Sequence, residues 1–97
     1  MCSPNHPRDP LPLGRVLTTP GALDALAAAG ADPRRLLDRH RRADWGDLDA
    51  HDRAANDAAI VEGERVLSAY TLRTGATVWI ITEADRSCTT FLLPDEY

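Results

Sequence analysis

Lysine and glutamine are both missing from this chain of 97 residues, and aromatic residues make up only 5% of it. All eleven basic residues other than histidine are arginines. Alanine is abundant in the same sequence, and this usage is typical of a GC-rich genome. The arginines are therefore not, by themselves, evidence for the bidentate phosphate contacts that distinguish arginine from lysine.

Long apolar runs are missing as well. No stretch approaches the roughly 20 residues that a membrane-spanning helix needs, and the proline-rich first thirteen residues have no apolar centre of the kind a signal peptide requires. The only two cysteines, Cys2 and Cys88, offer one disulfide at most, which fits a reducing compartment. We therefore predict a cytoplasmic protein with no membrane association.

The charge balance is acidic. Eleven arginines stand against fifteen aspartates and glutamates, which gives a formal charge of −4 and an isoelectric point near 5.2. General nucleic-acid binders usually carry the opposite excess, because contacts with phosphate supply most of their affinity. The composition therefore argues against nucleic acid as the partner. The length also excludes large cofactor-binding folds such as a dinucleotide-binding domain.

The pattern of apolar residues predicts one α+β domain over residues 14–97, behind an extended proline-rich arm of residues 1–13. Capping residues and apolar spacing near 3.6 indicate three short helices, at 21–29, 34–42 and 50–61. We expect the first helix to bury Leu23, Leu26 and Ala27, the second to bury Leu36, Leu37 and His40, and the third to bury Ala50, Ala54, Ala58 and Val61.

The last third of the chain changes to a spacing of two, which is typical of strands. Strands at 65–72, 77–82 and 88–93 are expected to form a three-stranded antiparallel meander. Residues 15–18 form either a fourth short strand or an extended lead-in to the first helix. The predicted architecture is thus a layer of helices on an antiparallel sheet.

Basic and acidic residues are separated along the chain. Residues 34–42 contain five arginines and one aspartate, whereas residues 44–64 contain five aspartates and two glutamates against one arginine. One interpretation is a solvated surface with local ion pairing. The other is a dipolar docking surface that steers a protein partner.

The loop between the second and third helices holds the first candidate binding residues, Asp44, Trp45 and Asp47. Trp45 lies in a polar stretch outside any periodic apolar run. It is either a lid over the core or an exposed aromatic anchor of an interface, the type of residue that dominates binding energy.

The turn after the strand at 77–82 holds the second group, Glu83, Asp85 and Arg86. They are either a charged hairpin loop or a contact surface for a partner. With His40 or His51, Glu83 and Arg86 also suggest an alternative function, a small ribonuclease or toxin similar to RelE and barnase, which place charged catalytic residues on an antiparallel sheet.

Four residues near the start of the third helix, Asp47, Asp49, His51 and Asp52, have side chains that can bind a divalent cation. An EF-hand loop needs glycine at its sixth position, and His51 or Asp52 falls there. Capping of the helix explains the carboxylates without a metal. We therefore predict no metal and no cofactor.

Two phrases resemble a known family. They are DWGDL at residues 44–48, preceded by His40, and WIITEADRS at residues 79–87, which continues to LLPDEY at the end of the chain. With residues 14–23, they resemble small "plasmid-related" proteins of bacterial mobile elements. Some members carry the label of a type I restriction methylation subunit, but this chain has neither a glycine-rich adenosylmethionine loop nor an Asn/Asp-Pro-Pro-aromatic motif.

The resemblance implies an accessory role on mobile DNA. We therefore expect a protein that works by binding another protein, such as a host defence complex, as an anti-CRISPR or anti-restriction inhibitor. The residues expected to make contact are Asp44, Trp45, Asp47, Glu83, Asp85 and Arg86.

Overall fold

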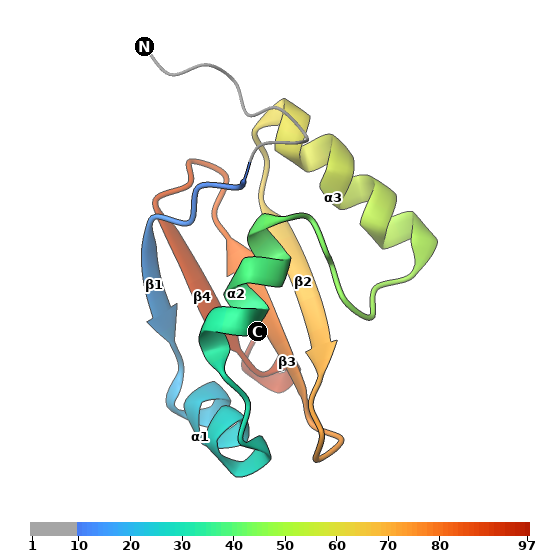
Figure 1. The fold of residues 1–97 in the computed structure, drawn as a ribbon. Coiled ribbons are helices and arrows are strands. Elements are labelled where there is room, and N and C mark those ends of the chain that lie inside the picture. The colour runs from blue at the N-terminus through green and yellow to red at the C-terminus, as the bar shows by residue number, and fades with distance from the viewer. Residues whose placement is uncertain (1–9) are drawn as a thin grey trace.

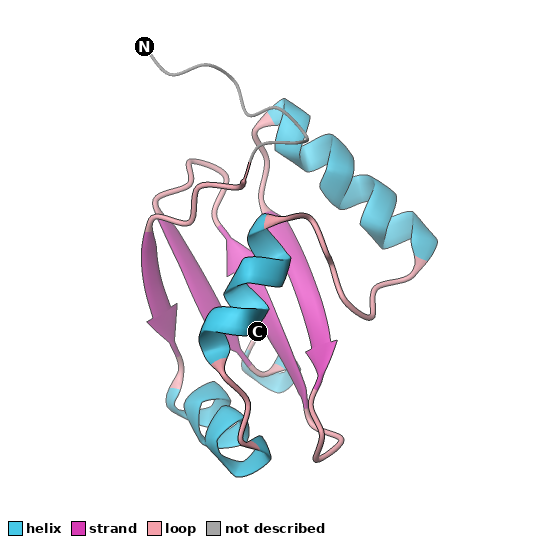
Figure 2. Cartoon of the chain, viewed as in Figure 1, coloured by secondary structure: helices cyan, strands magenta, loops and turns pink. Residues whose placement is uncertain are grey.

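The computed structural model describes residues 10–97, in which three helices lie against a sheet of four strands (Figures 1 and 2). The predicted α+β class is therefore confirmed. The elements in chain order are β1 (Arg15–Thr18), α1 (Pro20–Ala29), α2 (Pro33–Arg41), α3 (Ala50–Glu62), β2 (Val66–Thr71), β3 (Thr77–Thr82), β4 (Cys88–Leu92) and the short 3-10 helix η1 (Pro94–Glu96).

The sheet is mixed, with the order β1-β4-β3-β2. Strands β2, β3 and β4 form the predicted antiparallel meander, but β1 joins it in parallel to β4, with Arg15 opposite Cys88. The prediction of a purely antiparallel, three-stranded sheet was thus partly wrong, and residues 15–18 are a strand. The partner of β1 lies some seventy residues away, and local spacing carries no information about such a pairing.

Each helix begins where its capping residue predicts. The side chains of Thr19, Asp32 and Asp49 accept hydrogen bonds from backbone N–H groups in the first turns of α1, α2 and α3. Proline follows the cap at α1 and α2, where its fixed φ suits the first helical turn. Helix starts in this chain are therefore determined by local sequence.

The buried faces of α1 and α3 differ from those predicted. Leu23 in α1 is 53% exposed and Val61 in α3 is 57% exposed, whereas the buried residues are Ala22, Leu26 and Ala29 in α1 and Asn56, Ala59 and Ile60 in α3. Both helices are rich in alanine, which is only weakly apolar and lies on more than one face, so their sequences do not define one apolar stripe. In α2 the expected Leu36 and His40 are buried.

Two apolar clusters fill the space on the helix-covered face of the sheet. The larger cluster joins α1 and Leu36 to one end of the sheet, and its members are Ala22, Leu26, Ala29, Leu36, Tyr70, Leu72, Val78, Ile80 and Phe91. The smaller cluster packs α3 against the opposite end, through Leu11, Trp45, Ala59, Ile60 and Val66. Leu11 belongs to the segment predicted as an arm, of which residues 1–9 lie outside the described residues.

Candidate functional site

The predicted loop residues Asp44, Trp45 and Asp47 are bound to the outer edge of β2. The Asp47 N–H donates to Ala69 O over 2.7 Å, the Ala69 N–H donates to Trp45 O over 3.2 Å, and the Thr71 N–H donates to an Asp47 carboxylate oxygen over 2.7 Å. The loop thus acts as a short extra strand.

Asp44 is fixed from two sides. Its carboxylate accepts from Nε of Arg39 at 2.7 Å, and this bond holds the pKa of Asp44 below its usual value. Its carbonyl accepts from the Tyr70 hydroxyl at 2.6 Å, and burial raises the pKa of Tyr70 to about 12, so the phenol remains a donor. These contacts give Asp44 a role in fixing the loop.

Trp45 is only 2% exposed. Its indole N–H donates to Asp57 of α3 over 2.9 Å, and its ring meets the His40 imidazole edge-on, with 5.7 Å between centroids. The ring is therefore part of the core, as the lid interpretation expects, and offers no aromatic surface to a partner.

Helix α3 closes the rest of the β2 edge. The Asn56 side chain donates to Leu67 O over 2.6 Å and accepts from the Leu67 N–H over 3.1 Å. Together with the bonds from the loop to Ala69 and Thr71, this occupies the outward backbone groups of β2 along its length, so β2 cannot accept a further strand.

The second predicted group, Glu83, Asp85 and Arg86, forms the β3–β4 turn. The Arg86 guanidinium donates to Glu64 O at 2.7 Å and to Ala59 O at 3.3 Å, so it holds the end of α3 to the turn. Asp85 accepts from the Ser87 N–H at 2.9 Å, and hydrogen bonds from Ser87 lower its pKa. Glu83 contributes its backbone carbonyl to Arg86.

His40 lies in a buried chain of hydrogen bonds. Its Nδ1 is 2.5 Å from Ser68 Oγ, its Nε2 is 2.8 Å from Thr82 Oγ1, and Thr82 Oγ1 is 2.7 Å from Thr89 Oγ1. Thr89 donates its only proton to Leu13 O. Thr82 must then donate to Thr89 and accept from the His40 Nε2–H, which leaves Nδ1 to accept from Ser68.

This environment keeps the imidazole neutral. Burial lowers the pKa of His40 from 6.5 to about 4, with a smaller contribution from the nearby Arg86 charge. His40 and Ser68 are both fully buried, so neither meets a substrate, and Arg86 uses its donors on backbone carbonyls. His40 and Arg86, two of the residues named for a ribonuclease, are therefore engaged in holding the structure together.

The basic block is largely paired within its own neighbourhood. Arg34 contacts Asp32, Arg39 contacts Asp44 and Arg42 contacts Asp38, all at exposed positions. Such surface pairs contribute little stability. They match the interpretation of this segment as a solvated surface with local ion pairing.

Asp49, His51 and Asp52 bring possible ligand atoms within 4.8 Å of one another at the start of α3. All three are exposed, and the Asp49 carboxylate accepts the Asp52 N–H over 2.8 Å as the helix cap. The capping role thus accounts for this carboxylate, as the sequence predicts.

At the opposite edge of the sheet, β1 has no further strand beside it in the part of the chain that the structure describes. The N–H groups of Arg15 and Thr19 donate to Ser87 O and Phe91 O next to β4. In a parallel ladder alternate residues bond to the neighbouring strand, so the backbone groups of Val16 and Thr18 point away from the sheet. Within residues 10–97, β1 pairs with β4 alone.

Apolar side chains surround this open edge. Val16 is 46% exposed and Leu17 is 43% exposed, and the exposed Leu23 of α1 lies beside them. The three border an apolar groove of about 250 Å³ between β1 and the helices, whose remaining lining includes Leu26, Leu37 and Phe91. We call the outward backbone of Val16 and Thr18, with this groove, the β1 docking surface.

The sequence indicates an extended segment at residues 15–18 but does not reveal this surface. Val16 and Leu17 are two apolar residues in a short segment, and nothing local shows that they border an open edge. Asn56 and Asp47 close the β2 edge, but in the sequence they look like ordinary residues of a helix and of a turn. The difference between the covered β2 edge and the β1 edge can be recognised only once the order of the strands in the sheet is known.

Comparison with known proteins finds no match: no family model, no curated protein and no solved structure matches the chain. Across the described residues, none of the helices combines the length and the apolar character needed to cross a membrane.

Proposed function

We propose that this protein acts by binding another protein, and that the partner adds an extended segment to the open edge of β1. The observation that carries the proposal is the contrast between the two edges. The backbone of β2 is covered by the loop and by Asn56, whereas that of β1 is open and bordered by exposed apolar side chains. An unpaired edge is a template for a further strand.

The partner chemistry follows from the two parts of the β1 docking surface. The outward groups of Val16 and Thr18 bond to the backbone of an extended peptide, which gives affinity with little dependence on sequence. The groove takes one or two apolar side chains of that peptide, since its lining is largely apolar and includes Leu26, Leu37 and Phe91. A segment of alternating apolar residues fits both parts.

The biological role that we propose is that of a cytoplasmic accessory protein of mobile DNA, directed at a host defence complex. It is supported by the resemblance of residues 44–48 and 79–97 to plasmid-related proteins. An acidic binding protein suits an inhibitor that works by occupying a surface.

The test is affinity purification from a bacterial host, with Val16→Lys as the disrupting variant. A lysine at the open edge disfavours strand addition. Val61→Lys is the matched control, because Val61 is a similarly exposed valine on α3, away from β1. We expect the wild type and Val61→Lys to capture the same protein and Val16→Lys to lose it.

Capture that survives Val16→Lys would show that the partner binds elsewhere and would contradict the proposal. The role in defence is tested separately, by plating phage on a host that carries a restriction or CRISPR system. We expect expression of the wild type to restore plaques and Val16→Lys to fail, while unchanged plaque numbers with the wild type would refute the inhibitor role.

A further inference from the structure

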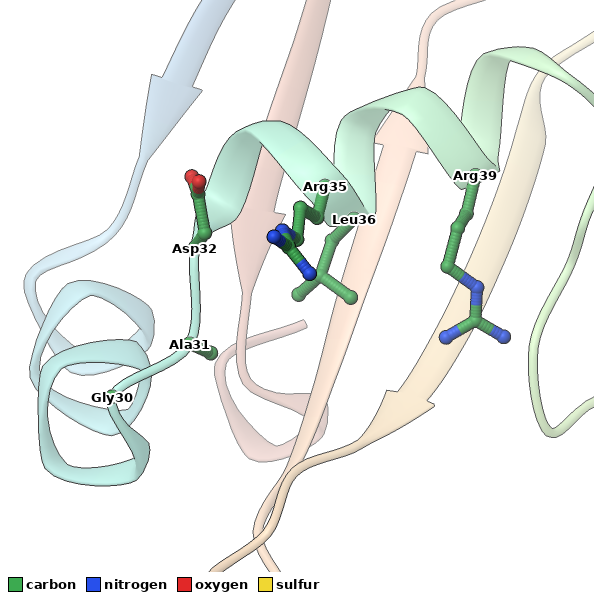
Figure 3. A pocket seen from close by; sticks show the side chains of 6 residues that line it. All are labelled: Gly30, Ala31, Asp32, Arg35, Leu36 and Arg39. Carbon is green, nitrogen blue, oxygen red and sulfur yellow. The ribbon is translucent and has the colours of Figure 1, made fainter.

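A hollow of about 560 Å³ lies on the side of α2 that faces away from the β1 docking surface. Its lining is Gly30, Ala31, Asp32, Arg35, Leu36 and Arg39. Figure 3 shows the guanidinium groups of Arg35 and Arg39 on the same side of α2, next to Leu36, while the Asp32 carboxylate points the other way. We call this site the arginine hollow.

A third guanidinium lies at its rim. Gly30 ends α1, and a Cβ atom built on Gly30 would lie 3.5 Å from Nη2 of Arg73 in the β2–β3 turn. Arg73 therefore reaches across to the lining of the hollow. The tertiary fold thus places an arginine of a distant hairpin close to Gly30, one of the residues that line the hollow.

The charges of the three arginines are not equally compensated. Arg39 is paired with Asp44 at 2.7 Å and its guanidinium stacks 4.6 Å above the centre of the Tyr70 ring, so it is held in place. Within residues 10–97, Arg35 and Arg73 form no ion pair and no side-chain hydrogen bond. Two positive charges therefore remain uncompensated.

Asp32, the acidic residue in the described lining, is bound mainly to Arg34, and its attraction to Arg35 is weaker. The Asp32 carboxylate accepts from the Arg34 N–H at 3.0 Å and contacts the Arg34 guanidinium at 3.4 Å. These bonds, the N–H bond foremost, lower the pKa of Asp32. The acidic total of the chain does not contradict a local positive site, because salt screens charges beyond about 8 Å.

We propose that the arginine hollow binds the phosphate monoester of a small organic molecule. Two uncompensated guanidinium groups match the two negative charges of a phosphate monoester, and each presents a fork of donors to oxygens. The volume exceeds what a bare phosphate fills, and Leu36 and Ala31 offer apolar contact to the organic part. This proposal does not depend on docking at β1.

The test is a titration of the full chain followed by the backbone amide signals of Gly30 and Ala31 in NMR spectra. Phenyl phosphate, inorganic phosphate and phenyl sulfate are the probes. We expect saturable shifts with phenyl phosphate, and affinities at least about tenfold weaker with inorganic phosphate, which lacks the organic part, and with phenyl sulfate, which carries one charge.

Substitutions of single arginines test whether phenyl phosphate binds in the hollow. Arg35→Gln and Arg73→Gln are each expected to weaken phenyl phosphate binding about tenfold, since each removes one charge-assisted contact. Arg42→Gln is the matched control: it changes a 67% exposed arginine at the end of the same helix, and neither Arg42 nor its partner Asp38 lines the hollow, so the affinity should stay unchanged. Val16→Lys should also leave it unchanged.

Three results would overturn the proposal. One is the absence of a saturable shift up to about 10 mM phenyl phosphate. The second is equal affinity for phenyl phosphate and inorganic phosphate, since the apolar lining would then contribute nothing. The third is an equal loss in Arg42→Gln and Arg35→Gln, which would indicate general attraction to a basic helix.

Discussion

His40 donates through Nε2 to Thr82 across 2.8 Å, and this bond joins α2 to the middle of the sheet. The imidazole lies between the two apolar clusters, where its neighbours Ser68, Thr82 and Thr89 are all fully buried. A polar group in such a place is costly unless its hydrogen bonds are complete. The chain of hydroxyls that ends at Leu13 O completes them.

The first prediction concerns pH and His40. Above pH 6.5 the imidazole is neutral in the folded and unfolded chains, but between pH 6.5 and about 4 only the unfolded chain binds the proton. The free energy of unfolding should therefore fall by roughly 3 kcal/mol as the pH drops through this window. Urea unfolding at a series of pH values measures it.

His40→Gln should remove most of this pH dependence, because glutamine does not titrate, although it also lowers stability at neutral pH. His51→Gln is the control, since His51 is exposed on α3, and it should preserve the wild-type profile. The carboxylates with lowered pKa, Asp44 and Asp85 among them, lose their contribution only nearer pH 4 and below. An unchanged slope in His40→Gln would show that another group titrates.

The second prediction compares two glycines with the same backbone conformation. Gly46 has φ of +75° and Gly63 has φ of +74°, so alanine meets the same left-handed strain at both. A Cβ at Gly46 would also collide with Ala69 O, whereas Gly63 has nothing within 4 Å. Gly46→Ala should therefore destabilise the protein by about 2 kcal/mol more than Gly63→Ala.

Chemical unfolding of the two variants tests this difference. Gly46→Ala should also loosen the loop from β2, which hydrogen exchange at the Ala69 amide detects as faster exchange. Equal stability of the two variants would mean that the loop moves away from β2 at little cost.

The third prediction concerns the clamp formed by Arg86. Its guanidinium bonds to the carbonyls at the end of α3, and its backbone has φ of +62°. Arg86→Ala removes the hydrogen bonds of the guanidinium and keeps the strain of the positive φ, so it should lower the free energy of unfolding by about 2 kcal/mol. Arg86→Gly loses the clamp but relieves the strain, and should be about 1 kcal/mol more stable than Arg86→Ala.

Thermal unfolding of these two variants measures the contrast. The reverse order, with Arg86→Gly the less stable, would indicate that chain entropy outweighs the left-handed strain at this turn.

The fourth prediction separates burial from binding at Trp45. Trp45→Phe removes the hydrogen bond to Asp57 and part of the ring, and should lower stability by about 1–2 kcal/mol without affecting capture of a partner. Because the ring is 2% exposed, a folded Trp45→Phe variant presents an unchanged surface. Loss of capture by this variant, with wild-type circular dichroism, would place Trp45 in the interface.

Much of the local structure was predictable. The caps Thr19, Asp32 and Asp49 begin their helices as expected, and the strand at 77–82 has the predicted bounds. Each depends on residues within a few positions of one another. Leu23 and Val61 were assigned to the wrong faces because an alanine-rich helix is nearly symmetrical in apolar character.

The candidate site was less predictable. Asp44, Asp47 and Arg86 stand out in the sequence because they interrupt apolar patterns, and the structure shows them bonding to backbone groups. In the sequence, a polar residue that holds a loop in place looks the same as one that binds a ligand. Arg35 and Arg73, in contrast, are unremarkable in sequence, and only the fold places both near Gly30 and the hollow.

By itself the sequence determined the class of the fold, the helix starts and the antiparallel hairpins. Helix capping, turn formation and the alternation of apolar and polar residues along a strand all depend on residues that are close together in the sequence. Only the tertiary structure decided that β1 lies beside β4, that one sheet edge is closed and the other open, and that His40 is enclosed. Those outcomes depend on contacts between segments many residues apart, where burial and complete hydrogen bonding select one arrangement from many that the local patterns allow.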